Sequence, residues 1–148
     1  MTDADVYAEV RNDLMRYATA LVGVSDAGDL VSTVVTRVLG RPGGLSGLDE
    51  PKPYLMKSIL NEARMRHRTR RRSDRALLAM TPIVGGGDHD HVLDLVMALP
   101  TRQRAAVYLT YYEKYPATEV ADLMGCRSAT VRRYLFLARQ KLREAIDE

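Results

Sequence analysis

Arginine and aromatic residues recur at helical spacing near the C-terminal end of the sequence. Arg132, Phe136, Arg139 and Arg143 are separated by four, three and four positions, which places them on one face of a helix. Guanidinium groups can bind guanine edges or phosphates, and an apolar side chain can contact thymine methyl groups. The pattern therefore favours a helix that enters the major groove of duplex DNA. The alternative is a solvated arginine face with Phe136 in a protein contact.

A second concentration of basic residues, RMRHRTRRR, occupies positions 64–72. The net charge of +3 conceals this block, because residues 1–60 carry −2, 61–75 carry +5, 76–100 carry −3 and 101–148 carry +3. Arginine concentrated in this way is typical of proteins that bind polyanions. Two such blocks, each following an amphipathic helix pattern, favour nucleic acid over a merely solvated charged surface.

Composition and length bound the remaining possibilities. The 148 residues are 46% hydrophobic and 28% charged, which are ordinary globular values, and the length suits one domain or two very small ones. No apolar run reaches the roughly 18–20 residues that span a bilayer. The N-terminal residues are acidic and lack the apolar segment of a secretory signal. A single cysteine excludes an internal disulfide framework, so we expect a cytoplasmic protein.

Amphipathic periodicity predicts three helices in the first half of the chain. The first covers 4–22, with apolar residues three and four apart from Val6 to Leu21. Ser25 or Asp26 is expected to cap the second, whose apolar positions run from Leu30 to Leu39. Glycine and proline in 40–53 predict a loop. The third helix should run from about Pro53 to Arg72, with a polar second half that leaves the core.

A glycine-rich segment separates this half from a second set of helices. Three successive glycines in AMTPIVGGGDHDH, residues 79–91, predict a flexible linker. Four helices are then expected, over 91–99, 102–113, 117–124 and 128–147. Gly125 suits the left-handed conformation that a tight turn between the last two requires. The last helix should bury the stripe formed by Val131, Leu135, Ala138, Leu142 and Ile146.

Strand signals are weak throughout, so the predicted fold class is all-α, with two small helical modules joined by a flexible linker. The predicted boundaries are 1–75 for the first module, 76–91 for the linker and 92–148 for the second module. The helix–turn–helix pattern of 116–146 carries the strongest local signal, because the glycine turn, the small Ala121 and both helical stripes agree.

These segments resemble a known family. The stretch LPTRQRAAVYLTYYEKYPATEVADLMGCRSATVRRYLFLARQKLRE resembles region 4 of sigma-70-family factors. The first module resembles region 2 through SDAGDLVSTVVTRVL and PYLMKSILNEARMRHRTRRR. Two regions in this order are similar to those of extracytoplasmic-function sigma factors, a class of bacterial transcription initiation factor that has a helical bundle and a helix–turn–helix.

The resemblance implies three sets of binding residues. Those expected to bind the minus 35 duplex are Arg104, Ser128, Thr130, Arg132, Arg133, Phe136 and Arg139. Those expected to hold the melted minus 10 strand are Tyr54, Lys57, Asn61, Arg64, His67, Arg68 and Arg71, with Arg66, Arg70 and Arg72 as further phosphate contacts. Those expected to bind core RNA polymerase are Asp29, Leu30, Ser32, Thr33, Val35 and Leu39. Asn61 matches the family asparagine that helps to hold a flipped base.

The implied partners are core RNA polymerase, through its beta-prime clamp helices and beta flap, and promoter DNA. An anti-sigma factor is compatible with the family, and no membrane is implied. Two other functions stay open on the residues alone. One is a stand-alone helix–turn–helix regulator that binds duplex DNA, and the other is an adaptor that binds only protein.

Other motifs favour simpler interpretations. Asp88, His89, Asp90 and His91 have ligand chemistry but lie in the glycine-rich linker with one distant cysteine, so no metal site is expected. Cys126 fits the turn of the helix–turn–helix as a small apolar residue. The sequence contains no phosphate-cradling loop, nucleophile elbow or HExxH motif, so we expect neither an enzyme nor a cofactor.

Overall fold

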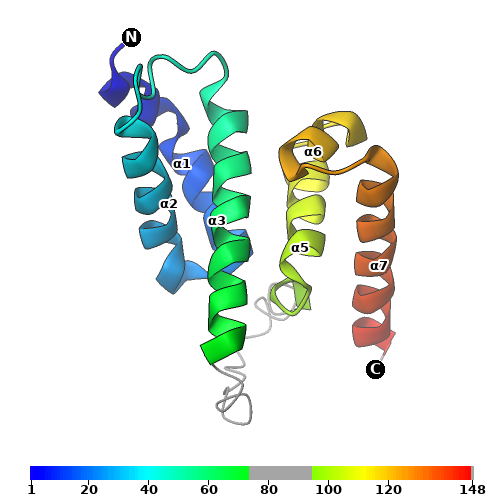
Figure 1. Ribbon diagram of the computed structural model, residues 1–148. Coiled ribbons are helices and arrows are strands. Elements are labelled where there is room, and N and C mark those ends of the chain that lie inside the picture. Colours follow the sequence, from blue (N-terminus) through cyan, green and yellow to red (C-terminus); the bar gives the residue numbers. More distant parts are fainter. Residues whose placement is uncertain (74–94, 148) are drawn as a thin grey trace.

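The chain is all-helical in the computed structural model, which describes residues 1–73 and 95–147. Helices α1 (Asp3–Val22), α2 (Val24–Leu39) and α3 (Pro51–Ser73) form the first module. Helix α5 (Thr101–Val107), the π-helical turn η3 (Tyr108–Tyr112), α6 (Ala117–Met124) and α7 (Ser128–Asp147) form the second. Figure 1 shows the two modules side by side, with α3 next to α5. The predicted fold class is therefore confirmed, whereas the predicted linker, 76–91, lies outside the described residues.

The first helix begins and ends where local chemistry requires. Thr2 and Asp5 form a reciprocal capping box, in which the Asp5 N–H donates to Thr2 Oγ1 at 3.2 Å and the Thr2 N–H donates to Asp5 Oδ2 at 3.0 Å. Gly23, at φ 90°, both ends α1 and precedes α2. The expectation that Ser25 or Asp26 caps α2 is wrong, because α2 begins at Val24 without a side-chain cap.

The first module has a core of large apolar side chains. The predicted stripe of α1, from Val6 to Leu21, is buried. It packs against α2 and α3, which contribute Leu30, Val31, Val34, Leu55, Met56, Ile59 and Leu60. After Ala63 the helix continues beyond this core, and the side chains of Met65, His67, Arg68 and Thr69 are exposed. The polar second half of α3 therefore projects from the bundle, as its sequence predicts.

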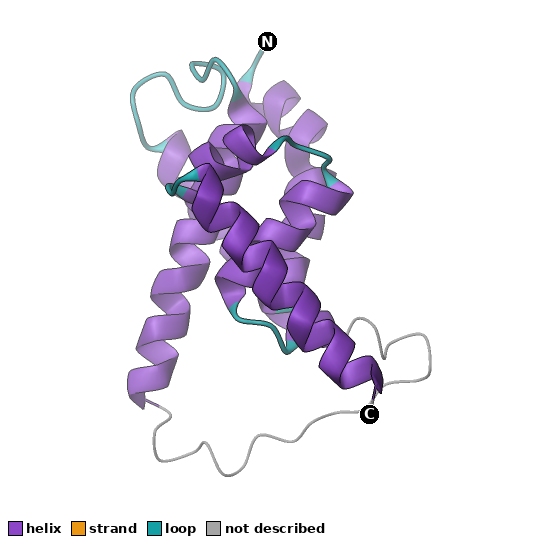
Figure 2. Ribbon diagram, turned by 90° about the vertical axis from the view of Figure 1, so that its right-hand side faces the viewer, coloured by secondary structure: helices purple, strands orange, loops and turns teal. Residues whose placement is uncertain are grey.

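The second module is built around the turn between α6 and α7. Gly125 adopts a left-handed conformation with φ 66° and ψ 39°, and the Cys126 N–H donates to the Ala121 carbonyl at 3.0 Å. Val131, Leu135 and Ala138 are buried, but Leu142 is half-buried and Ile146 is 68% exposed. The predicted stripe is therefore buried only in the first half of α7. In Figure 2 α7 crosses the front of the molecule and ends at the C-terminus.

The two modules pack against each other. Helix α1 contacts α5, and α3 contacts both α5 and α6. Lys52 Nζ lies 2.7 Å from Glu113 Oε2 and 3.2 Å from Asp13 Oδ2, which joins α3 and α1 to the end of η3. The rings of Tyr17 and Tyr108 are 5.2 Å apart between centroids. The buried apolar residues of both modules therefore form one continuous core.

Candidate nucleic-acid interface

Helix α7 presents an exposed basic face above its buried stripe. The side chains of Arg132, Arg133, Phe136 and Arg139 are exposed, and Phe136 keeps 57% of its surface accessible. Ser128 and Thr130 lie half-buried at the start of the same helix. Helix N-termini and hydroxyl groups of this kind can bind phosphate. Six of the seven residues expected at the minus 35 duplex thus lie together on α7.

Arg139 is the one arginine of this face that the protein itself contacts. Its Nε donates to Tyr111 Oη at 3.1 Å, and the guanidinium carbon lies 6.0 Å from the ring centroid. Arg132 and Arg133 form no hydrogen bond or ion pair with any described residue. The face therefore offers two unengaged guanidinium groups and one whose direction is fixed by an aromatic neighbour.

Arg104, the seventh residue of that set, turns away from α7. One of its terminal nitrogens, Nη1, lies 3.4 Å from the Ala20 carbonyl of α1, and Nη2 lies 3.4 Å from Thr101 Oγ1. Burial between the modules lowers the pKa of the Arg104 guanidinium from its usual value. In this arrangement Arg104 joins the two modules and is not on the surface that α7 presents.

The residues expected at the minus 10 strand follow α3 from its start. Lys57, Asn61, His67 and Arg68 are exposed, and Tyr54 and Arg64 are half-buried. Arg71 belongs to α3, but its side chain lies outside the described part. Except for that side chain, the predicted set is therefore accessible or partly accessible along one projecting helix.

Arg41, which the sequence did not single out, contacts Tyr54. Its Nη1 donates to Tyr54 Oη, and its guanidinium carbon lies 5.7 Å from the centroid of the ring. Arg41 is the one basic residue of the predicted loop, 40–53, before Lys52, but nothing in the sequence pattern indicated that it contacts Tyr54. The contact fixes the orientation of a ring that is expected to face an unpaired base.

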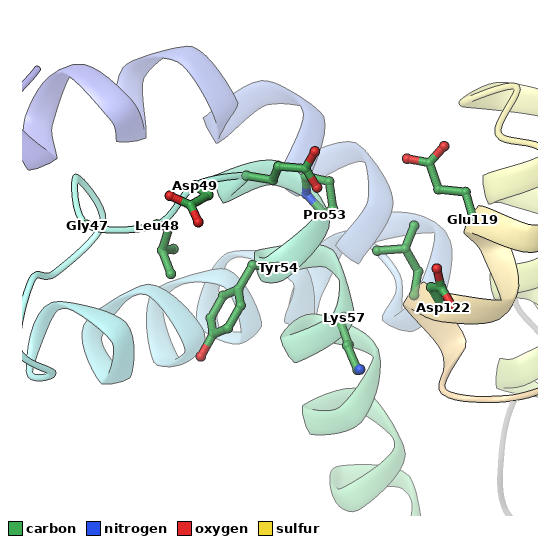
Figure 3. Close-up of a pocket in the computed structure, with 10 residues that line it drawn as sticks. Gly47, Leu48, Asp49, Pro53, Tyr54, Lys57, Glu119 and Asp122 are labelled. Atoms are coloured by element: carbon green, nitrogen blue, oxygen red, sulfur yellow. The ribbon is translucent and has the colours of Figure 1, made fainter.

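A cavity of about 710 Å³ lies between this region and the second module (Figure 3). The first module contributes Gly47, Leu48, Asp49, Glu50, Pro53, Tyr54 and Lys57, and α6 contributes Glu119, Asp122 and Leu123. Two acidic side chains of α6 thus border the surface expected to take the melted strand. Negative charge beside Tyr54 and Lys57 opposes the approach of phosphate in this arrangement.

The residues expected to bind polymerase divide into two groups. Asp29, Ser32 and Leu39 are exposed, and Thr33 is half-buried. Leu30 is 0% and Val35 8% exposed, so both are core residues and the expectation that they form a docking surface is wrong for their side chains. Apolar periodicity cannot distinguish core residues of α2 from residues that bind a partner, because one helix can use adjacent faces for packing and for binding.

Arg66 connects α2, which carries the residues expected to bind polymerase, to the basic second half of α3. Its Nη1 lies 2.8 Å from Asp29 Oδ2, and its Nη2 donates to Thr33 Oγ1 at 2.9 Å. Glu62 lies behind it, within 3.4 Å of Arg66 and 3.2 Å of Arg37. Arg66 is therefore held against α2. This contact could not be predicted from local sequence patterns, because it joins residues more than 30 positions apart.

Metal chemistry finds no support among the described residues, where no group of three or more His, Cys, Asp or Glu side chains could hold an ion. The segment Asp88–His91 lies outside that part of the chain. Cys126 is half-buried in the turn between α6 and α7. Over residues 1–73 and 95–147, none of the helices has the length and apolar character needed to cross a bilayer.

Comparison with known proteins gives consistent results. The family model "Sigma-70, region 4" matches residues 89–142. The chain is 27% identical to the RNA polymerase sigma-E factor of Streptomyces avermitilis, over 95% of this chain and 83% of that protein. It is 26% identical to the RNA polymerase sigma-E factor of Streptomyces antibioticus, over 82% of this chain and 71% of that protein.

The fold also matches a solved structure. The sigma factor RpoE, crystallised with the anti-sigma factor NepR from Bartonella quintana, superposes with a TM-score of 0.76 and 20% identity, over 95% of this chain and 94% of that one. The family match identifies the helix–turn–helix of the second module with sigma-70 region 4. Together with the two sigma-E relatives, this match identifies the chain as a transcription initiation sigma factor.

Proposed function

We propose that the chain binds core RNA polymerase and directs it to promoters through two DNA contacts. The second module, as region 4, reads the minus 35 duplex with α7. The first module, as region 2, holds the melted minus 10 strand along α3. The exposed row of Arg132, Arg133 and Phe136 above the buried stripe of α7 carries this proposal. It combines the basic and apolar groups that base edges and phosphates require.

The proposed polymerase contact uses the exposed part of α2. Asp29, Ser32, Thr33 and Leu39 would meet the beta-prime clamp helices, while Leu30 and Val35 support the helix from the core. The second module would meet the beta flap. Asp29 already pairs with Arg66, so a basic partner at Asp29 would compete for that carboxylate.

The compact arrangement has a consequence for promoter binding. Glu119 and Asp122 of α6 border the proposed minus 10 surface, and Arg104 is engaged between the modules. For Arg104 to clamp phosphate and for Tyr54 to meet a base, α6 has to move away from α3. We therefore propose that the two modules separate when the chain binds polymerase and DNA.

Further parts of the proposal concern partners and location. The structural neighbour was crystallised with an anti-sigma factor, which supports such a partner for this chain as well. The relatives are sigma factors, which supports a role in the cytoplasm without covalent chemistry or a cofactor. The bound partners are then polymerase, promoter DNA and an anti-sigma protein.

Transcription with purified components tests the proposal. The chain is added to core RNA polymerase, and promoter-dependent transcripts are measured from genomic fragments. We expect a stable complex with core and transcripts that begin at defined positions. If no complex with core forms and the chain alone binds a duplex operator tightly, the protein is a stand-alone regulator instead.

Substitution of Asn61 tests the minus 10 role. Asn61→Ala should impair strand opening, measured by permanganate reactivity of unpaired thymines, more than initial docking, measured by gel shift. The reason is that an extruded base needs amide-type hydrogen bonds, whereas the closed duplex does not. Asn12→Ala, an exposed asparagine on α1, is the matched control. Equal loss of opening and docking would remove the proposed role of Asn61.

A further inference from the structure

A second cavity, of about 300 Å³, lies between α3 and the second module. Helix α3 contributes Arg64, His67 and Arg68. The second module contributes Pro100, Thr101, Arg102, Gln103 and Tyr134. This volume is at the lower end of the range for small-molecule sites, about 300–1,000 Å³. The cavity exists because the two modules pack together, and neither module forms it alone.

The charge of this cavity is one-sided. Three guanidinium groups and an imidazole line it, and no carboxylate of the described residues does. Within the described part of the chain, no acidic side chain forms an ion pair with Arg64, Arg68 or Arg102. Burial lowers the pKa of Arg64, and repulsion from Arg102 and Arg68 lowers it further. Three positive charges are therefore close together without a described anionic partner. Their mutual repulsion costs free energy, and a bound anion would offset that cost.

Arg102 is held in place for such a contact. Its Nε donates to Tyr134 Oη at 2.7 Å and its Nη2 donates to the Met124 carbonyl at 3.2 Å. The guanidinium carbon lies 5.3 Å from the centroid of the Tyr134 ring. These contacts leave Nη1 free to donate to a ligand. Because the side chain is already ordered, less conformational entropy is lost when a ligand binds.

A buried polar atom at the same cavity also lacks a partner. Gln103 is 7% exposed, and its Oε1 has no hydrogen-bond partner. Buried polar groups in proteins are almost always hydrogen-bonded, and this enclosed oxygen would gain a partner if the Gln103 amide turned toward a ligand in the cavity. An amide beside an aromatic ring and several guanidinium groups matches a nucleobase or sugar joined to phosphate.

We propose that this cavity binds a small phosphate-bearing anion of nucleotide size. Arg64, Arg68 and Arg102 hold the phosphate, and Gln103 and Tyr134 contact the rest of the molecule. Because the lining comes from both modules, the ligand stabilises the packed arrangement. This regulatory role rests on the proposed function, since a bound anion and the melted strand then compete for Arg64 and Arg68.

Binding to the free chain tests the site without polymerase. The probes are orthophosphate, pyrophosphate, ADP and a short single-stranded oligodeoxynucleotide, each titrated by calorimetry into the full chain at fixed ionic strength. We expect ADP and pyrophosphate to bind one per chain and to raise the melting temperature, with orthophosphate weaker. Since each guanidinium makes charge-assisted hydrogen bonds, Arg68→Gln should weaken ADP binding about ten-fold.

Matched variants separate this site from general attraction to a basic protein. Arg68 is exposed and makes no ion pair with a described residue, so its replacement should leave the fold intact. Arg11→Gln removes the same charge from an exposed position on α1 and should leave ADP affinity unchanged. Arg102→Gln should reduce binding at least as much as Arg68→Gln, and its melting temperature shows whether it is folded.

The two sources of phosphate give different results. If only the oligonucleotide binds, and neither ADP nor pyrophosphate saturates, the small-ligand site is overturned while the proposed function stands. If Arg11→Gln and Arg68→Gln weaken ADP equally, binding is nonspecific and the proposal fails. If ADP binds as expected but the chain forms no complex with core polymerase, the site stands and the proposed function fails.

Discussion

The two modules bury different kinds of side chain. Among the leucine, isoleucine, methionine and tyrosine side chains of the described residues that are less than 2% exposed, only Leu109 belongs to the second module. The other fully buried side chains of the second module are smaller valines and alanines, such as Val120, Val131, Ala105 and Ala106. Small side chains let helices approach closely but remove less apolar surface from water. The second module therefore gains part of its stability from its contact with the first.

Leu109→Ala should have the largest effect on this difference. Leu109 is 0% exposed, and removing it leaves a cavity that costs about 2–5 kcal/mol of unfolding free energy. Because Leu109 is the one fully buried leucine described in the second module, hydrogen exchange in α5–α7 should accelerate well before exchange in α1–α3. Urea unfolding and exchange followed by mass spectrometry measure the two effects.

The matched variant is Leu60→Ala, which removes the same side chain from a position that is 1% exposed in the first module. It should lower the free energy of unfolding by a similar amount. Amide hydrogen exchange should become faster in both modules, because the second module depends on the first. If Leu109→Ala accelerates amide hydrogen exchange equally in both modules, the two form one cooperative unit, and the difference between them described above is contradicted.

Lys52→Met should have the next largest effect, because it acts on the contact between the modules. Glu113 retains 8% of its side-chain surface, so removal of Lys52 leaves its carboxylate buried without its cation. The expected loss is about 2 kcal/mol. A second change, Glu113→Gln, should recover part of that loss since it removes the unpaired charge. Thermal unfolding of the two variants checks this, and failure of Glu113→Gln to recover stability would exclude the pair as a major support.

The same ion cluster gives a pH dependence. Burial alone would lower the pKa of Lys52, but hydrogen bonds from its ammonium to Glu113 and Asp13 outweigh burial and raise that pKa above the ordinary 10.5. A raised pKa in the folded state stabilises the fold at all pH values below 10.5 and ceases to do so as the pH rises through the folded value. On the alkaline side, the stability difference between wild type and Lys52→Met should therefore shrink as the pH rises through the folded pKa of Lys52.

Helix positions were predictable from sequence because each depends on neighbours a few residues away. The periodicity of α1, the glycine turn at Gly125 and the exposed row on α7 all have this local origin. The π-helical turn at Tyr108–Tyr112 was not predicted, since one inserted residue shifts the periodicity too little to detect. The burial of the α7 stripe failed at Ile146 because burial needs a partner helix as well as an apolar face.

The candidate site was predictable only in part, for the same physical reason. Residue type and spacing correctly placed Arg132, Phe136 and Arg139 on one exposed surface. They did not reveal that Arg104 reaches the Ala20 carbonyl or that Lys52 meets Glu113, because these contacts join segments more than 60 positions apart. Such contacts depend on how whole modules pack, and charge pattern along the chain does not determine that packing.

Two glycine substitutions, one in each module, give the smallest expected effects and opposite signs. A Cβ atom would meet nothing within 4 Å at either Gly28 of α2 or Gly125 after α6, so packing does not distinguish them. Gly125 has φ 66°, where an L-residue is strained, and Gly125→Ala should cost about 1 kcal/mol. Gly28 lies inside a helix, so Gly28→Ala should stabilise by about 0.5–1 kcal/mol. Melting temperatures should move a few degrees apart. If Gly125→Ala stabilised the protein, Gly125 would not hold the left-handed conformation in the turn of the second module. The small apolar core around that turn would then contribute less stability than the structure indicates.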